Sequence, residues 1–166
     1  MKHRLASAVS SALILAACSS VPIVLEPVGP GPSGVGASTR YGELEVFTET
    51  EEYNDGDIIC HPHTDYQIYT PDGKRLKRVW NALPGGDEFP AEVTLPAGNY
   101  LVKARADFNG PVTVPVVIGT NRVTQVVLQL GWKPKGRFDE ADLVRLPNGY
   151  FVGWRANPPA KPTVKE

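Results

Sequence analysis

Between Tyr41 and Leu130 the chain consists of short runs in which polar and apolar residues alternate, with turn-forming residues between the runs. Successive side chains of a β-strand point to opposite faces, so alternation over about four to eight residues predicts a half-buried strand. No stretch of this range has a convincing apolar repeat of about 3.6 residues, which a helix would need. The runs are Glu43–Phe47, Tyr66–Thr70, Arg75–Trp80, Ala91–Leu95, Tyr100–Ala104, Val112–Ile118 and Val123–Leu130. This spacing predicts an all-β fold, a single antiparallel β-sandwich over residues 41–131.

The same alternation predicts which side chains face the core. A shift of one residue would move every one of them to the solvent side, so we expect a firmly defined register. The predicted inward face consists of Leu44, Val46, Tyr66, Ile68, Val93, Leu95, Tyr100, Val102, Val114, Val116, Val126 and Leu128.

A further pair of strands is predicted near the C-terminus. The runs Leu143–Leu146 and Tyr150–Trp154 flank Pro147-Asn148-Gly149. Asn-Gly between apolar runs favours a hairpin, because both turn positions need positive φ. An isolated hairpin is marginally stable, so residues 132–156 are expected to form a linker and a hairpin docked on the sandwich. Residues 157–166 are expected to form a flexible tail.

The first residues of the chain have the pattern of an export signal. Lys2 and Arg4 precede an apolar run that ends at Leu15-Ala16-Ala17-Cys18. This run is too short for a spanning helix, which needs about 20 apolar residues. Its last four residues resemble the lipobox of bacterial lipoproteins. The resemblance implies that residues 1–17 are a cleaved signal peptide and that Cys18 becomes the lipidated first residue, carrying palmitate. An ordinary cleaved signal with a chance cysteine is the alternative.

The lipobox resemblance also implies a location. The residue after the cysteine is Ser19 rather than Asp. This resembles the sorting signal for the outer membrane in proteobacteria and implies a lipid-anchored protein of the bacterial cell envelope, with the membrane as a partner through the lipid. Residues 18–40 contain many Pro, Gly and Ser residues, which predicts a tether that spans roughly 25 Å as a flexible coil.

Charge and cysteine content narrow the possible partners. The chain has 17 basic and 18 acidic side chains, and loss of Lys2 and Arg4 with the signal leaves a balance of −3. We therefore expect no nucleic-acid partner. Once Cys18 is lipidated, Cys60 is the single remaining cysteine and no internal disulfide can form.

One motif of the predicted sandwich resembles a known class of module. The segment Val93-Thr94-Leu95-Pro96-Ala97-Gly98-Asn99-Tyr100 resembles the Leu-Pro-x-Gly-x-Tyr signature of carboxypeptidase-regulatory-like and PEGA-type β-sandwich modules. The preceding Asp72-Gly73-Lys74 turn and the Gly42–Val46 strand fit the same pattern. The resemblance covers roughly residues 41–130. It implies an immunoglobulin-like or transthyretin-like sandwich and a non-catalytic binding or spacer unit.

A histidine cluster is a candidate metal site. Cys60, His61, His63 and Asp65 lie within six consecutive residues, and the two histidines are the only ones outside the signal. In an extended strand His61, His63 and Asp65 project to one side, whereas Cys60 points away. Such ligands suit zinc or copper, although a further ligand would be needed. The alternative is a polar strand entry with Cys60 as a small buried residue.

Aromatic residues concentrate near the C-terminus. Trp132, Phe138, Tyr150, Phe151 and Trp154 could stack on a sugar ring or anchor a protein partner, or the hairpin could bury them against the sandwich. Alternation places Tyr150 and Trp154 on one face and Phe151 on the other. One face could thus be buried while the other stays available.

The sequence therefore favours a non-catalytic binding or structural module that contacts an envelope protein or a glycan. The partner-binding candidates are Trp154, Phe151 and Tyr150. An envelope metal-binding protein that uses Cys60, His61 and His63 is the alternative. The chain contains no nucleophile elbow, no His-Glu-x-x-His motif and no phosphate-binding glycine loop, so enzymatic activity is not expected.

Overall fold

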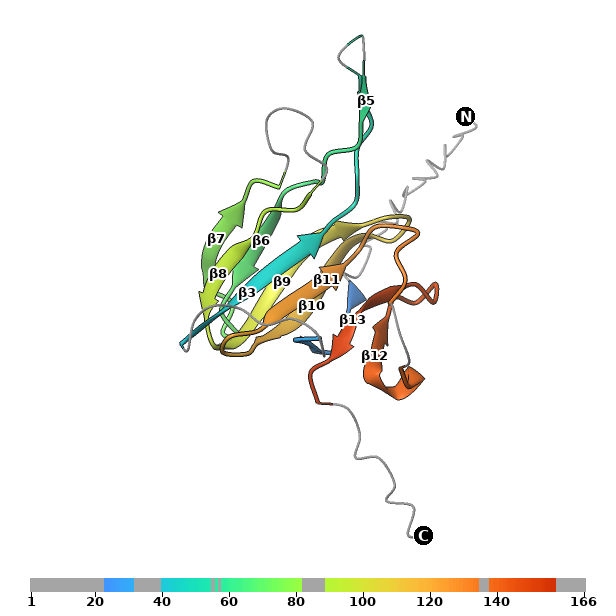
Figure 1. Cartoon of the computed structure of the whole chain (residues 1–166). Helices are drawn as coiled ribbons and strands as arrows, with labels where there is room; N and C mark the ends of the chain where they lie inside the picture. Colours follow the sequence, from blue (N-terminus) through green and yellow to red (C-terminus); the bar gives the residue numbers. More distant parts are fainter. Residues whose placement is uncertain are drawn as a thin grey trace, which may run out of the picture.

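The computed structural model describes residues 23–31, 40–54, 56, 58–81, 89–134 and 138–157. Within this part the chain is all-β, as predicted, with a single short 3-10 helix (Figure 1). Cys18, the signal sequence and the tail 158–166 lie outside the described residues. The strands are β1 Ile23–Val24, β2 Val28–Gly29, β3 Tyr41–Phe47, β4 Tyr53–Asn54, β5 Ile59–Cys60, β6 Tyr66–Tyr69, β7 Arg75–Val79, β8 Val93–Pro96, β9 Gly98–Ala106, β10 Gly110–Ile118, β11 Val123–Val127, β12 Leu143–Arg145 and β13 Phe151–Arg155, and the 3-10 helix is Glu140–Asp142.

The strands form two main sheets and one small ribbon. The larger sheet has the order β12-β13-β2-β10-β9-β6-β7, and β1 also pairs with β10. The smaller sheet has the order β11-β3-β8, and β4 pairs with β5. The prediction of an entirely antiparallel fold is wrong, because β1 and β2 run parallel to β10 and β11 runs parallel to β3. Both β3 and β11 begin at the same end of the molecule, so they point the same way where they pair.

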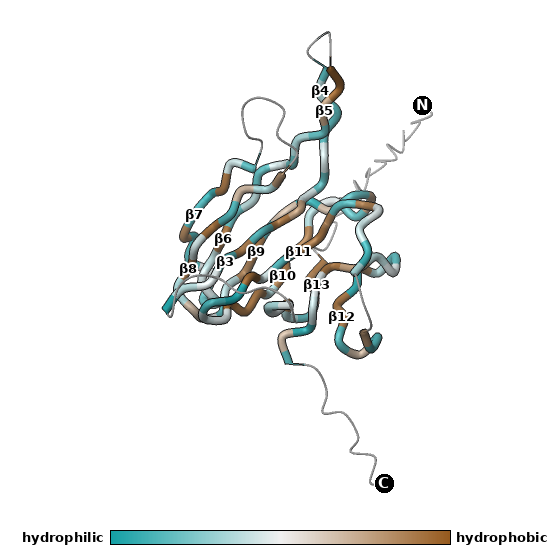
Figure 2. The backbone as a smooth tube through the Cα atoms, in the orientation of Figure 1, coloured by the Kyte–Doolittle hydropathy of each residue, from teal (hydrophilic) through white to brown (hydrophobic). Residues whose placement is uncertain are grey.

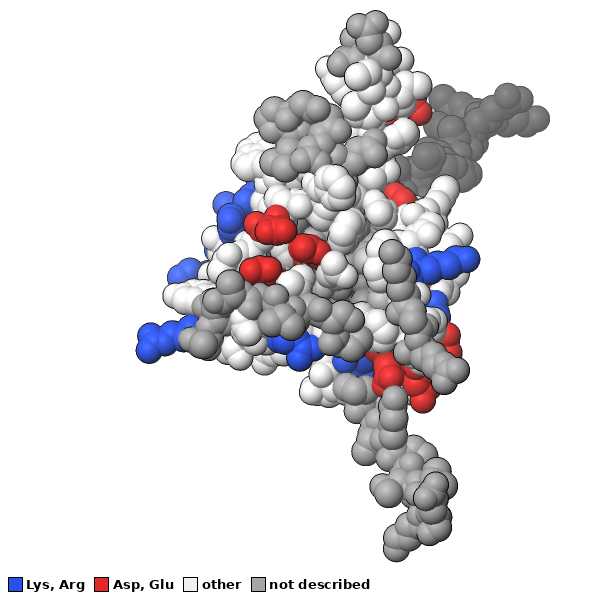
Figure 3. Space-filling view, viewed as in Figure 1, with Lys and Arg blue, Asp and Glu red and all other residues white. Residues whose placement is uncertain are grey.

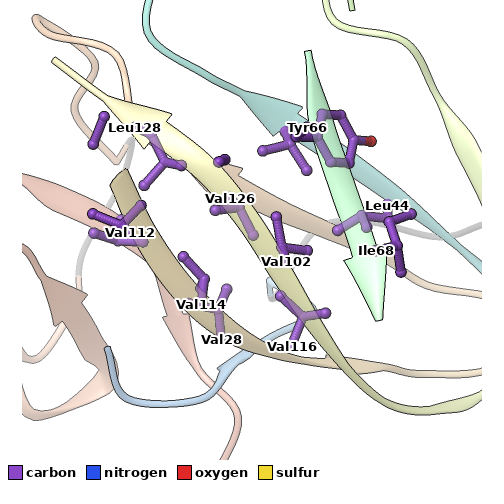
Figure 4. Packing of buried hydrophobic residues seen from close by; sticks show 14 of the residues in the cluster. Val28, Leu44, Tyr66, Ile68, Val102, Val112, Val114, Val116, Val126 and Leu128 are labelled. Carbon is purple, nitrogen blue, oxygen red and sulfur yellow. The ribbon is translucent and has the colours of Figure 1, made fainter. Parts of the chain in front are cut away.

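The two main sheets bury a shared core. Burial alternates strictly along β3 and β10, as the sequence pattern requires. Valines from β10, β9 and β11 meet Leu44 of β3 and Ile68 of β6 in one cluster (Figure 4). The predicted inward residues are buried with one exception. Tyr100 is half-buried, because its hydroxyl donates to the carbonyl oxygen of Pro96 over 2.9 Å.

Residues 23–31, which their composition assigned to a tether, belong to the fold. Val28 is fully buried among the core residues and pairs with Val116 of β10, while Gly29 pairs with Trp154 of β13. Its two strands, Ile23–Val24 and Val28–Gly29, are each two residues long, so they show no alternating pattern among the prolines and glycines. The segment thus joins the sandwich to the C-terminal hairpin.

The hairpin of β12 and β13 is present and closes at Gly149, which has a φ of 88°. Besides the pairing of β13 with β2, Arg155 makes side-chain contacts: it pairs with Glu26, and its guanidinium donates to the carbonyl oxygens of Ala141 and Leu143. The hydrogen bond from Arg155 lowers the pKa of Glu26. These contacts fix the hairpin to the segment that precedes β2.

The two ends of the main sheets differ, and we name them by their connections. The turn pole is formed by three tight turns, Thr70–Lys74, Pro96–Gly98 and Gly119–Arg122. The loop pole, from which β4 and β5 project in Figure 1, is formed by the described parts of residues 48–64, 80–92, 107–109 and 128–131. At the turn pole the chain crosses between sheets twice, because β8 and β9, and also β10 and β11, belong to different sheets.

Candidate functional site

The four residues of the predicted metal cluster have separate environments. His63 is 2% exposed; its Nδ1 lies 2.8 Å from the carbonyl oxygen of Thr48, and its ring meets Phe47 edge-on. Asp65 accepts hydrogen bonds from Arg78 Nη2 at 2.9 Å and from the backbone N–H of Asn81 at 3.0 Å. Cys60 is half-buried on the projecting ribbon and His61 is exposed. In the described residues no three His, Cys, Asp or Glu side chains are grouped so that they could hold a metal ion. These four therefore do not form one zinc or copper site here.

His63 instead belongs to a buried polar network beneath the loop pole. Asn81 is fully buried, and its Nδ2 donates to the carbonyl oxygen of Val46 and to Thr48 Oγ1. Its Oδ1 accepts from the backbone N–H of Ala91 at 2.9 Å. Thr48 Oγ1 in turn donates to the carbonyl oxygen of Thr64 at 2.7 Å. Three segments far apart in sequence are thus bonded together, which sets the position of the loops above them.

The hairpin buries more of its aromatic side chains than predicted. Phe151 is 5% exposed and packs with Val127 and Leu143 in a second small cluster, so it is not available to a partner. Val152, on the opposite face, is fully buried in the main core. Both faces are covered because Val152 packs into the main core, whereas Phe151 packs on the other side against Val127 of β11. The prediction of one buried and one available face is wrong for this strand.

A groove of about 390 Å³ lies at the edge of this second cluster. Trp132 stacks on Phe151 with ring centroids 4.8 Å apart and forms its floor, while the exposed rings of Phe138 and Tyr150 line its rim. The basic side chains of the lining are Lys133 and Arg145. Arg145 is held by Glu140 at 2.8 Å, so its orientation is fixed. Of the three partner-binding candidates, Tyr150 lines the groove exposed, Phe151 supports it, and Trp154 is half-buried behind it against Phe151 and Phe138.

The groove has the composition of a binding site for a ring-shaped group. Its volume lies at the lower end of the range of about 300–1,000 Å³ that is typical of small-ligand pockets. Aromatic faces favour the apolar C–H face of a sugar or a second aromatic ring, and an ammonium group can donate to a ligand oxygen. Among the described residues, the lining contains no carboxylate, histidine or cysteine.

A second hollow, of about 430 Å³, lies on the outer face of the larger sheet. Its three cationic side chains already have partners. Arg78 pairs with Asp65, Arg105 pairs with Glu49, and Lys103 lies over the ring of Tyr69 at 4.5 Å. Outward-facing acidic residues occupy the other sheet, where Figure 3 shows acidic side chains gathered over β3 and β8. We regard this hollow as a solvated sheet face rather than a site.

The sequence-based predictions missed a third feature, the apolar surface of the loop pole. Phe108, in the turn between β9 and β10, is 85% exposed and has a φ of 61°. This left-handed conformation normally selects Gly or Asn and costs other residues roughly 1–2 kcal/mol. Trp80, 66% exposed, and Tyr53, 59% exposed, lie on neighbouring loops of the same pole. One feature of the sequence could have indicated it: Phe108 directly precedes Asn109-Gly110, a pair of residues that favours a turn.

Comparisons of the chain with protein-family models, with curated protein sequences and with solved structures gave no significant match. In the described residues no helix is long and apolar enough to cross a membrane.

Proposed function

We propose that the chain is a lipid-anchored, non-catalytic binding module of the bacterial envelope, with Cys18 as the lipidated residue. The lipobox resemblance of Leu15–Cys18 supports the anchor, and Ser19 supports a place in the outer membrane. The Leu95–Tyr100 motif supports an immunoglobulin-like or transthyretin-like sandwich of the carboxypeptidase-regulatory-like or PEGA type. The motif spans the corner where the chain passes from β8 to β9.

The observation that carries the binding function is the aromatic groove beside the hairpin. Its fixed floor of Trp132 on Phe151 and its exposed rim of Phe138 and Tyr150 suit a sugar ring of an envelope glycan, with Lys133 as a donor to its oxygens. The floor needs no rearrangement to receive a ligand, because its rings are already stacked. A side chain of an envelope protein is the other occupant that a test must distinguish.

The test uses the native tryptophan as a reporter. Soluble fragments of envelope glycans are titrated into the protein while Trp132 and Trp154 fluorescence is recorded. Tyr150→Ala should weaken binding roughly five- to tenfold, because loss of one aromatic contact costs about 1 kcal/mol. Tyr41→Ala is the matched control, since Tyr41 is similarly exposed (44% against 47%) but lies at the turn pole. Equal affinities of the two variants, or no saturable change in fluorescence, would contradict a glycan site in this groove.

The anchor is tested independently of the groove. Labelled palmitate should enter the wild-type protein and not the Cys18→Ser variant, and the variant should be lost from the membrane fraction. Incorporation of the label into both proteins would refute lipidation at Cys18.

A further inference from the structure

Exposed apolar side chains are concentrated at one end of the molecule. Of the twelve large hydrophobic side chains that are exposed in the described part of the chain, seven lie at the loop pole. The brown tip of the β4–β5 ribbon in Figure 2 is part of this surface. The seven are Tyr53, Ile58, Ile59, Trp80, Phe89, Phe108 and Leu130. At the turn pole the corresponding residues in the described part are Tyr41 and Leu76.

The course of the chain brings the same pole towards the anchor. β1 runs parallel to β10, so the chain that precedes Ile23 enters from the end where β10 begins. β10 begins at the turn that carries Phe108, because Gly110 pairs with Ala106 of β9. Cys18 is five residues before Ile23, and five residues extend over at most about 17 Å. A lipid on Cys18 therefore holds the loop pole close to the bilayer.

We propose that the loop pole rests on the surface of the bilayer, with Phe108 and Trp80 in the headgroup region of zwitterionic phospholipid. This inference rests on the lipid anchor of the proposed function. Aromatic side chains are enriched at the interface between membrane and water, where an apolar ring meets a polar environment. The anchor makes this contact intramolecular, so a few exposed rings suffice to orient the domain.

The backbone at Phe108 supports a contact outside the domain. Phe108 occupies a left-handed conformation that disfavours a large side chain, yet its ring is almost fully exposed and adds little to the core. The turn is otherwise well bonded: the N–H of Asn109 donates to Ala106 over 3.1 Å, and Leu130 donates to Asp107 Oδ2 over 2.8 Å. Strained, exposed residues of this kind are typical of functional positions. A rigid turn therefore presents an aromatic ring in the direction of the membrane.

Charge selects the kind of lipid. Glu51 and Glu52 are exposed beside Tyr53 on the ribbon. The nearby arginines have carboxylate partners: Arg105 pairs with Glu49, and Arg78, which lies over the Trp80 ring at 4.3 Å, pairs with Asp65. Most of the charged side chains visible in Figure 3 lie below this end of the molecule. An anionic surface would repel the two carboxylates. We therefore expect closer contact with phosphatidylcholine or phosphatidylethanolamine than with anionic lipid.

The experiment uses the lipidated full chain with 5-fluorotryptophan at its three tryptophans. The protein is placed in phosphatidylcholine vesicles that contain a lipid spin-labelled near its headgroup, and the fluorine spectrum is recorded. We expect loss of the Trp80 signal and persistence of the signal of Trp154 in the hairpin. Replacing part of the phosphatidylcholine with anionic lipid should restore some of the Trp80 signal. A Trp80 signal that survives in the anchored protein would overturn the inference while leaving the anchor intact.

Two further outcomes of this experiment distinguish failure of the anchor from contact with a protein instead of lipid. If the protein stays in solution with all three signals unchanged, the proposed anchor fails, and the inference fails with it. If Trp80 is broadened only by a spin-labelled envelope protein and not by spin-labelled lipid, the pole binds protein and the lipid proposal is wrong.

One substitution should change thermal stability and membrane contact in opposite directions. Phe108→Asn should raise the midpoint of thermal unfolding, since Asn tolerates the left-handed conformation, and should also restore the Trp80 signal in vesicles. Tyr41→Asn, at the turn pole, should leave the Trp80 broadening unchanged. An increase in stability with undiminished broadening would show that the Phe108 ring does not hold the domain on the lipid.

Discussion

The two poles of the domain are held together by different parts of the chain. At the turn pole the backbone closes on itself: Asn121 donates to the carbonyl oxygen of Tyr41 at 2.9 Å, and Ala97 donates to that of Arg40 at 3.1 Å. At the loop pole backbone bonds are also present, such as that from Leu128 to the carbonyl oxygen of Phe47 at 2.7 Å, but the buried side chains of Asn81 and Thr48 add bonds to distant backbone groups. The turn pole is closed by short turns, which leave little room for insertion. The loop pole needs these buried side chains in addition, because its loops are longer and carry apolar residues on their outer surface.

The largest effect is expected at the buried network of the loop pole. Asn81→Ala should lower the free energy of unfolding by about 3 kcal/mol, because the carbonyl of Val46, the hydroxyl of Thr48 and the N–H of Ala91 each lose a partner. Urea denaturation monitored by tryptophan fluorescence measures this loss. Asn99→Ala, an exposed position on β9, is the control and should change stability by less than about 0.5 kcal/mol. Equal stability of the two variants would mean that the loop pole does not depend on Asn81.

At the turn pole, the free energy of unfolding should be sensitive to added side-chain volume rather than to the loss of hydrogen bonds. A Cβ at Gly42 would lie 2.2 Å from the carbonyl oxygen of Gly119 and 2.8 Å from that of Arg122, which are backbone atoms with little room to move. Gly42→Ala should therefore cost about 2 kcal/mol in the same denaturation experiment.

Gly131→Ala at the loop pole is the matched comparison. A Cβ there meets no atom within 4 Å, although its φ is 84°, so the cost should be about 1 kcal/mol from backbone strain alone. If Gly42→Ala costs no more than Gly131→Ala, the turn pole is not as closely packed as the structure shows.

The smallest effect at neutral pH is expected for Tyr66, in the core between the poles. Its hydroxyl makes no hydrogen bond with a described residue, so Tyr66→Phe should change stability at pH 7 by less than about 1 kcal/mol. Burial raises the pKa of Tyr66 well above its ordinary value of about 10. The folded state therefore keeps a proton that the unfolded state loses above about pH 10, and stability falls as the pH rises further. Denaturation between about pH 9 and 12 should show a shallower fall for Tyr66→Phe, and identical slopes would contradict the raised pKa.

The sequence predicted the turn pole well because its signals are local. Asp72-Gly73 and Gly119–Asn121 lie between alternating runs, and each closes a turn within a few residues. Alternation likewise identified the buried face of each strand, since burial depends on parity alone. What parity cannot show is which sheet a strand joins. The corner at Pro96–Gly98, for example, connects two strands of different sheets, β8 and β9.

The loop pole and the hairpin depended on contacts between distant segments, which no local pattern reveals. Asn81 was not singled out, because its partners are 10 to 35 residues away. His63 was considered a metal ligand for its neighbours in sequence, whereas its partner in space is Thr48. Phe151 and Val152 are both buried because each face of β13 meets a different cluster, Phe151 with Val127 and Val152 with the main core. The groove was anticipated only as a concentration of aromatic residues.

The position of β2 has a consequence for the biogenesis of the protein. Within the larger sheet, β2 lies between β10 and the last strand of the chain, β13. While the polypeptide is being synthesised or exported, β2 can join β10, but its outer edge stays unpaired until residues 151–155 have emerged. A shorter chain therefore exposes this edge of β2, which is a template for aggregation. The C-terminal hairpin thus covers the edge of β2 as well as forming the groove.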